Sequence, residues 1–279
     1  MNHICFNGKL IPGDTPILRA DNRGYRYGDA LFETMKMYKG KIMLEPFHLE
    51  RLSAGIALMQ LQLPALINPQ ALFRQASALC EKNQCQSMAR IRLTVSRGNG
   101  GIFEGNPVAD YLIECWPLDQ PMNELNENGL LLGIYPDARK SIDRFSHLKT
   151  ASCMPYVMAA LYTQSQKLND CLLLNSKERI ADSVIANFFM IRDGIIYTPS
   201  LEEGCVDGVM RKYLIQALRE RGEEVMETGL TTADLATADE VFLTNSIRGI
   251  RWVKQAGDQR YGYTRTLDIY RHFVQTLWA

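Results

Sequence analysis

The sequence predicts a chain of two α+β domains, and three observations support this: its length, its order of elements and one change in composition. A chain of 279 residues is long enough for one large or two medium domains. Strand-like and helix-like segments mix without the strict strand–helix–strand order of a doubly wound sheet. Residues 116–129 hold two prolines, three asparagines and several acids, which is typical of a linker. We therefore expect an N-terminal α/β sandwich domain at residues 1–117, a linker at 118–128 and a C-terminal α/β pseudo-barrel domain at 129–279.

The first domain is expected to hold three strands and two helices. Apolar residues at helical spacing predict one helix that Pro64 closes, and a second helix begins at a proline. Alternation of apolar and polar residues predicts the strands, with Arg90, Arg92 and Thr94 on one face of the middle strand. The expected strands are residues 31–38, 89–95 and 110–115, and the expected helices are residues 45–61 and 69–82.

The second domain is expected to mix further strands and helices. Asp193-Gly194 predicts a hairpin turn between two apolar segments. Gly222 predicts the end of one helix, and Asp207 is its expected N-cap. The expected strands are residues 130–135, 171–174, 184–191, 195–197, 224–226 and 240–244, and the expected helices are residues 152–167, 208–221 and 267–277.

Charge and cysteine usage narrow the classes of function. Lysine plus arginine and aspartate plus glutamate both number 31, so the chain lacks the basic surplus typical of proteins that bind nucleic acid or anionic lipid. Its apolar runs are too short to span a bilayer, and its start does not resemble a signal peptide. Seven scattered cysteines predict reduced, buried thiols in a cytoplasmic protein. Four scattered histidines argue against a metal site.

Two charged residues stand out in apolar surroundings. Asp182 begins a segment that otherwise predicts a buried strand, and a buried carboxylate needs a cationic partner. The alternative is an acid at a strand edge that points to solvent. Lys149 precedes a helix of small and apolar residues, where a lysine of lowered pKa becomes a usable amine nucleophile. The alternative is a solvated lysine at a loop–helix junction.

Two glycine-containing segments complete the set of candidate residues. Residues 203–211 lead into a helix, whose exposed N–H groups form an anion site, although an ordinary capped helix is the alternative. Arg97 opens the glycine-rich segment 96–101 and is suited to clamp a carboxylate, although a flexible loop is the alternative. Together, an amine, an acid for a ring nitrogen, a phosphate site and an arginine are the parts that pyridoxal 5′-phosphate (PLP) requires.

The sequence resembles the class-IV PLP-dependent aminotransferases, the group that includes branched-chain and D-amino-acid aminotransferases and aminodeoxychorismate lyase. The resemblance runs nearly end to end, and its motifs follow one another in the family's order. They are FNGKLIP at 6–12, DNRGYRYGDALFET at 21–34, HLERL at 48–52, Lys149 with PYVMA at 155–159, ANFF at 186–189, YTPS at 197–200, GVMR at 208–211 and ADEVFLT at 238–244. The resemblance implies the two-domain D-amino-acid-aminotransferase-like fold, which is PLP fold type IV.

The resemblance also implies roles for individual residues. Lys149 is similar to the catalytic lysine that forms the internal aldimine with PLP. Asp182 takes the place of a glutamate that binds the pyridine nitrogen, so its side chain is one methylene shorter, and Ser152 stands where asparagine is common. Arg51 is similar to the arginine that contacts the phosphate. Further cofactor contacts are implied for Asn187, Val209, Met210, Ser246 and Ile247, and substrate contacts for Arg97, Tyr25 and Phe32.

The implied reaction moves an amino group between an amino acid and a 2-oxo acid by a 1,3-proton shift, with Lys149 as general base and acid. A homodimer, with the cofactor between the two domains, is implied as well. An aminodeoxychorismate lyase, which releases pyruvate and leaves 4-aminobenzoate, stays open because residues 97–101 resemble the glycine-rich loop of those enzymes, although Ile-Phe-Glu follows it. A non-catalytic binding module of this fold stays open too, on the two substitutions at 152 and 182.

Overall fold

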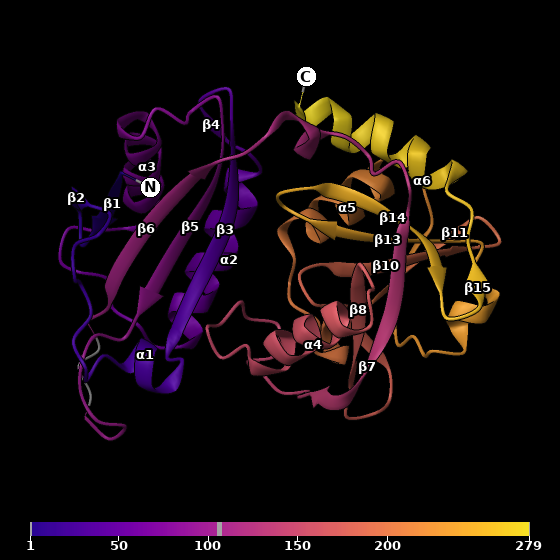
Figure 1. Ribbon diagram of the computed structural model, residues 1–279, viewed down its shortest axis with the longest axis horizontal. Helices are drawn as coiled ribbons and strands as arrows, with labels where there is room; N and C mark the ends of the chain where they lie inside the picture. Colours follow the sequence, from indigo (N-terminus) through magenta and orange to yellow (C-terminus); the bar gives the residue numbers. More distant parts are fainter. Residues whose placement is uncertain (1, 105–107, 279) are drawn as a thin grey trace. The chain divides into compact units, whose positions relative to one another are not determined.

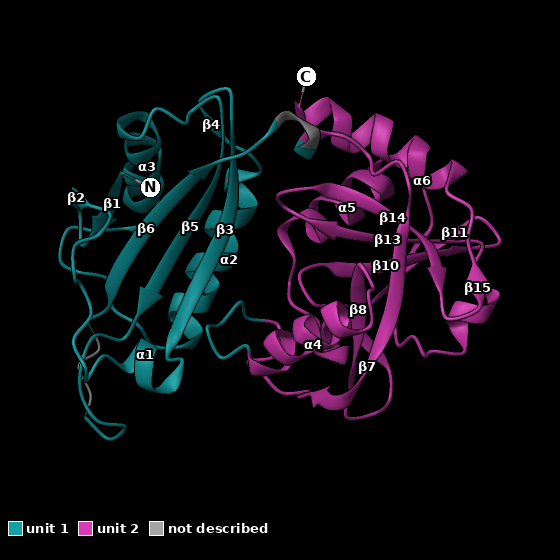
Figure 2. Cartoon of the chain, in the orientation of Figure 1, with its two compact units in different colours: residues 1–122, 148–153 teal, residues 123–147, 154–279 magenta. Residues whose placement is uncertain are grey.

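The chain divides into two compact units, and each is described by itself (Figure 2). The structure is a computed structural model that describes residues 2–104 and 108–278. Unit 1 comprises residues 1–122 and 148–153, and unit 2 comprises residues 123–147 and 154–279. The chain therefore passes from one unit to the other inside the expected linker. The short segment 148–153 was expected in the C-terminal domain but groups with unit 1.

Unit 1 is built on a six-stranded sheet in the order β2-β1-β6-β5-β3-β4 (Figure 1). All of its strand pairs are antiparallel. Its strands are β1 (His3–Phe6), β2 (Lys9–Pro12), β3 (Ala30–Tyr38), β4 (Lys41–Ile42), β5 (Met88–Ser96) and β6 (Asp110–Pro117). Its helices are α1 (Arg23–Tyr27), α2 (Glu45–Leu58) and α3 (Pro69–Lys82). The 3₁₀ turn η1 (Gln120–Asn123) lies where the chain passes from unit 1 to unit 2.

Side-chain alternation along β5 gives unit 1 its two faces. Ile91, Leu93 and Val95 are fully buried in one apolar core with residues of α2 and α3. Arg92 and Thr94 lie on the opposite face and are partly exposed. The predicted alternation is thus confirmed, and so is the helix over residues 69–82, where Asn68 caps the first turn by accepting a hydrogen bond from the Ala71 N–H.

Main-chain contacts hold the segment 148–153 against β3. Leu31 and Thr150 form an antiparallel bridge. The Phe32 N–H donates to the Lys149 carbonyl (2.9 Å), and the Ala151 N–H donates to the Ala30 carbonyl (2.8 Å). The segment is in effect a short added strand, which is why Lys149 belongs to unit 1 although it follows the linker in sequence.

Unit 2 contains a nine-stranded mixed sheet in the order β12-β11-β10-β13-β14-β7-β8-β9, with β15 paired to β14. Only the β11–β12, β14–β7 and β7–β8 pairs among the described strands are parallel. The strands are β7 (Leu130–Lys140), β8 (Asp170–Asn175), β9 (Ile180–Ser183), β10 (Asn187–Arg192), β11 (Ile195–Pro199), β12 (Val225–Thr228), β13 (Glu240–Asn245), β14 (Gly249–Ala256) and β15 (Gln259–Arg260). The helical elements are α4 (Met154–Ser165), η2 (Leu201–Glu203), α5 (Val209–Glu220), η3 (Asp234–Thr237), α6 (Thr264–Ile269), η4 (Tyr270–Val274) and η5 (Gln275–Trp278).

Two predicted strands differ from the structure in ways that matter for the site. The predicted strand 184–191 begins only at Asn187, because the Ser183 N–H donates to the Ala186 carbonyl (2.8 Å) and closes a turn there. The strand predicted to end at residue 135 runs on to Lys140. It does so across a bulge, after which Lys140 pairs with Asn175 of β8.

Two predicted helix starts were wrong. Gly208 is the N-cap of α5 rather than Asp207, and no side chain caps this helix. The last helix starts at Thr264 rather than at residue 267. The Glu240 carboxylate, from β13, accepts hydrogen bonds from the Arg265 and Thr266 N–H groups (2.8 and 2.7 Å). A cap supplied by a distant strand leaves no local pattern in the sequence.

Candidate active site

Lys149 lies in unit 1 beside β3 and is half-buried. Its Nζ is 4.6 Å from the centre of the Phe32 ring, within the range of a cation–π contact. Phe32, Glu33, Arg51 and Lys149 together line a small cavity. Three of the residues predicted from the sequence, Phe32, Arg51 and Lys149, therefore meet in one place.

A buried acid fixes the position of Arg51. Glu33 is 2% exposed and accepts hydrogen bonds from Arg51 through both of its oxygens, with Nε 2.8 Å from Oε1. His48 Nδ1 lies 2.6 Å from Glu33 Oε2. Burial opposes the charge of Glu33, but Arg51 and His48 outweigh it and lower the pKa of this carboxyl from 4.5 to about 2. Glu33 therefore stays ionised and holds the guanidinium of Arg51 in a fixed plane.

A second cation contacts the same aromatic ring. Arg92 of β5 lies on the face of the sheet that carries Phe32, and its guanidinium carbon is 3.9 Å from the ring centre. Burial lowers the pKa of Arg92, which Glu114 partly offsets. In the sequence, Arg92 is marked only by its place in an alternating strand. The signal available was a pair of arginines, Arg90 and Arg92, on the strand face opposite the apolar core.

Arg97 and Tyr25, predicted to contact substrate, have different surroundings. Arg97 Nε donates to Asp29 (2.9 Å), and its terminal nitrogens donate to the carbonyls of Met59 (2.6 Å) and Gln60 (3.3 Å). Its guanidinium is thus held by residues of unit 1. Tyr25 is 75% exposed on α1. The substrate role of each stays a prediction.

Asp182 in unit 2 is buried, and Lys140 is the cationic partner that a buried carboxylate needs. Asp182 is 2% exposed, and its Oδ2 accepts hydrogen bonds from Lys140 Nζ (3.1 Å) and from the Val206 N–H (3.0 Å). The Tyr156 hydroxyl lies 3.2 Å from Oδ1 and 3.1 Å from Oδ2. The bulge in β7 and the pairing of β8 with β9 bring Lys140 to this carboxylate. The charge on Asp182 is therefore held in a fixed position by three donors.

Beside Asp182, the start of α5 has no capping side chain. Gly208 is the N-cap, and Val209 and Met210 begin the helix without a capping side chain. Asn187 Nδ2 donates to the Val206 carbonyl (2.8 Å). A side chain at Gly208 would bring its Cβ to 1.7 Å from Asn187 Oδ1, so only glycine allows this close approach. The exposed N–H groups of the helix favour a bound phosphate.

The ends of two strands adjoin this helix start. Asn187 of β10 pairs with Thr244 of β13. The Thr244 hydroxyl is buried and, within residues 2–104 and 108–278, has no hydrogen-bond partner. Beyond β13, the Ile247 N–H donates to Asn245 Oδ1 (3.1 Å) in the turn that also holds Ser246. Asn187, Val209 and Met210 thus lie together at the start of α5, and Ser246 and Ile247 lie in the turn that follows β13.

These residues fit the chemistry of PLP. The cofactor carries an aldehyde, a ring nitrogen and a phosphate. The chain offers an amine at Lys149, a buried acid at Asp182 that pairs with Lys140, and an uncapped helix start at Val209. The Val206 peptide contacts both Asp182 and Asn187, so one short segment of chain links the acid to the start of α5.

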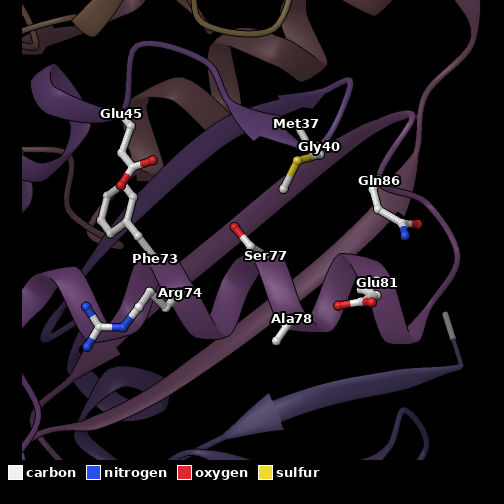
Figure 3. Close-up of a pocket in the computed structure, with 9 residues that line it drawn as sticks. All are labelled: Met37, Gly40, Glu45, Phe73, Arg74, Ser77, Ala78, Glu81 and Gln86. Atoms are coloured by element: carbon white, nitrogen blue, oxygen red, sulfur yellow. The ribbon is translucent and has the colours of Figure 1, made fainter.

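Unit 1 also has an open groove between α3 and the β3–β4 hairpin (Figure 3). Arg74, Ser77 and Glu81 of α3 line one side, and Met37 and Gly40 line the other. Charged side chains of both signs are spread along it, and none of the residues predicted for catalysis lines it. Met37 is five residues from Phe32 along β3, or about 16 Å at the rise of a strand.

Comparison with known proteins identifies the family. The amino-transferase class IV model matches residues 30–256, which is most of the chain. The aminodeoxychorismate lyase of Bacillus subtilis (strain 168) is 27% identical over 266 residues, covering 93% of this chain and 88% of that protein. Among the described residues, we find that none of the helices combines the length and the apolar character that crossing a membrane requires.

Solved structures show the same fold. The branched-chain aminotransferase of Thermoproteus uzoniensis superimposes with a TM-score of 0.89 at 18% identity, covering 99% of this chain and 94% of that one. The PLP-bound form of a hypothetical aminotransferase from Mycobacterium tuberculosis gives a TM-score of 0.84 at 19% identity, covering 99% of both chains. The expectation of PLP fold type IV is confirmed. The chain belongs to the class IV aminotransferase family and is an enzyme.

Proposed function

We propose that this enzyme is a PLP-dependent aminotransferase that moves an amino group between an amino acid and a 2-oxo acid. The observation that carries the proposal is the buried Asp182 carboxylate, fixed by Lys140, Tyr156 and the Val206 N–H next to the uncapped start of α5. An ionised acid and an anion site on one short segment suit the two ends of PLP.

Each residue then has a chemical role. When bound, PLP supplies an electron-withdrawing ring that takes up the charge left when a proton leaves the substrate Cα. Lys149 would hold the cofactor through Nζ, and its amine would serve as the general base and acid that moves the substrate Cα proton. Asp182 would hold a proton on the ring nitrogen, and Lys140 and Tyr156 fix the position of its carboxyl group.

The phosphate would be held by the N–H groups at Val209 and Met210, with Asn187, Ser246 and Ile247 around them. Arg51 is proposed as a further phosphate contact, presented in a fixed plane by Glu33. Arg92, partly buried against Phe32, is the arginine in unit 1 that we propose for a substrate carboxylate, in addition to the predicted Arg97. A homodimer in the cytoplasm stays part of this proposal.

The lyase alternative is favoured by one observation. The aminodeoxychorismate lyase of Bacillus subtilis is 27% identical to this chain, and the D-alanine aminotransferases are 22–23% identical. The same Lys149 and Asp182 serve both reactions, since each starts with loss of the substrate Cα proton. The reactions differ in the product: the lyase expels pyruvate, and the aminotransferase passes its amino group to a second acid.

The cofactor is tested by peptide mapping. The protein is expected to be yellow after incubation with PLP, and borohydride should bleach it and fix PLP on Lys149. Trypsin then fails to cut at Lys149 and yields a peptide of residues 145–167 in place of 145–149. Lys149→Ala should lose the fixed PLP, and Lys254→Ala, on β14, should keep it. A colourless wild type that fixes no PLP would contradict the proposal.

The reaction is tested with two sets of substrates. We expect amino transfer from at least one member of an amino-acid panel to 2-oxoglutarate or pyruvate, with no turnover by Lys149→Ala. Aminodeoxychorismate is offered separately, with pyruvate as the readout. Pyruvate release without amino transfer to any acceptor would overturn the aminotransferase in favour of the lyase.

A further inference from the structure

Three cysteine sulfurs gather in the core of unit 1, apart from the residues assigned to the cofactor. Cys80 lies near the end of α3, Cys85 follows that helix, and Cys115 lies on β6. The three residues are 0%, 4% and 2% exposed, and their Sγ atoms all lie within 4.8 Å of one another. Apolar side chains of α3, β5 and β6 surround them in the same core.

Cys115 is the hydrogen-bond acceptor of this cluster. Asn83 Nδ2 donates to its Sγ (3.2 Å). The orientation of the Asn83 amide is fixed, because its Oδ1 accepts the His3 N–H (3.0 Å) and its Nδ2 also donates to the His3 carbonyl (2.8 Å). Cys85 Sγ lies 3.6 Å from Cys115 Sγ and donates to it. Donors around a sulfur favour its thiolate form, which is the form that reacts with oxidants.

The titration of the three thiols agrees with this geometry. The Cys80 thiol, followed by Asn83 and Cys85, lowers the pKa of Cys115. The pKa of Cys80 is raised, chiefly because its proton bonds to Cys115, and burial raises the pKa of Cys85. The pKa of Cys115 is thus lowered beside two thiols whose pKa values are raised.

Cys85 is the better placed of the two thiols to bond with Cys115. A disulfide has an S–S length near 2.05 Å, so the pair at 3.6 Å needs an approach of about 1.5 Å. Cys85 lies beyond the end of α3, next to Gln84, whose φ is +55°. Chain outside a helix moves more easily than chain within it, where Cys80 lies.

We propose that Cys85 and Cys115 form a thiol–disulfide site that responds to peroxides. The Cys115 thiolate attacks one oxygen of hydrogen peroxide, the O–O bond breaks, and the other oxygen leaves as hydroxide and takes a proton to become water. The sulfenic acid on Cys115 is then attacked by the Cys85 sulfur, which loses its proton, and a second water leaves. Overall, two thiols are oxidised to one disulfide, and one peroxide is reduced to two waters.

Charge suits this chemistry. The cysteines are next in sequence to Glu81 and Gln86, which line the open groove of unit 1 (Figure 3). The disulfide is neutral, which an apolar core favours. A metal would need further thiols to ionise there, and structural zinc takes four ligands. The described residues offer only these three as a metal-ligating group.

Trypsin separates every cysteine that the test requires. Cys80 falls in peptide 75–82, Cys85 in 83–90 and Cys115 in 98–139. The reduced full-length enzyme is treated with hydrogen peroxide, its free thiols are blocked with an alkylating agent, and the peptides are identified by mass. We expect peptide 83–90 linked to peptide 98–139, and loss of the link on reduction. Cys171, fully buried with no cysteine neighbour among the described residues, lies in peptide 168–177 and should stay free.

Variants then test the assignment. Cys115→Ser and Cys85→Ser should abolish the link, and Cys80→Ser and Cys171→Ser should retain it. The wild-type mapping decides the matter even where a variant fails to fold. The proposal is overturned if all three thiols stay alkylatable, if peptide 75–82 takes the place of 83–90, if Cys171 oxidises as fast, or if metal analysis finds an ion that protects the three thiols.

Discussion

Replacing Glu33 with glutamine tests the cluster that positions Arg51. Glu33 is almost fully buried and is held by two bonds to Arg51 and one to His48. Glutamine keeps the shape and one acceptor oxygen but removes the charge. The buried guanidinium of Arg51, 10% exposed in its side chain, then loses its ion-pair partner.

The magnitude follows from the pKa of Glu33. Arg51 and His48 hold this pKa near 2 in the folded protein, against 4.5 for an ordinary glutamate. At 1.36 kcal/mol for each pH unit, the folded state gains about 3 kcal/mol from the ionised form. Because the pKa is depressed by folding, this gain is complete above pH 4.5 and is lost as the pH falls towards 2. Removal of one partner from a buried ion pair costs about 3–5 kcal/mol of stability, which is a similar magnitude.

The assay is urea unfolding at several pH values. At pH 7 (well above both pKa values) we expect Glu33→Gln to lower the free energy of unfolding by about 3 kcal/mol. The difference from the wild type should shrink as the pH is lowered below 4.5. Glu50→Gln, an exposed neighbour of Arg51 on the same helix, is the matched control and should change stability by under about 0.5 kcal/mol. Equal effects of the two variants, or a difference that does not depend on pH, would refute the reasoning.

Two further predictions concern unit 2. Asp182→Asn leaves the buried ammonium of Lys140 without its partner and should cost about 3 kcal/mol in urea unfolding, with amino transfer nearly lost. Asp182→Glu should restore the charge. If this variant recovers neither stability nor turnover, the role of the charge is contradicted. Gly208→Ala places a Cβ 1.7 Å from Asn187 Oδ1 and should weaken PLP binding about tenfold or more by titration, at a cost of about 1–3 kcal/mol in stability. Gly262→Ala, whose nearest contact would be 3.8 Å away, should bind PLP like the wild type.

The sequence predicted well those features that depend on local pattern. The helix over residues 69–82 follows from apolar spacing, a proline and an asparagine cap, all of which are local. The need of Asp182 for a cation follows from the cost of burying a carboxylate, and the ion pair with Lys140 confirms it. Local pattern could not show which cation pairs with Asp182, because Lys140 comes to Asp182 only after a bulge between Ile134 and Arg139 of β7.

Other features arise only from contacts between distant segments. Asp207 has the composition of an N-cap, but its N–H donates to the His147 carbonyl and the helix begins one residue later. Arg97 follows a strand and precedes glycines, as a ligand-binding arginine would, yet Asp29 and two carbonyls hold its guanidinium. In both cases the sequence shows the residue type but not the partner, and the partner decides the role.

The tether of Lys149 to β3 has a consequence for how this enzyme can change. The two hydrogen bonds that fix the segment 148–153 join peptide groups only, from Phe32 to Lys149 and from Ala151 to Ala30. Every residue type except proline can make them. Mutations at Thr150, Ser152 or Cys153 can therefore accumulate without moving the amine, so evolution can alter the neighbourhood of the lysine while its location is inherited unchanged.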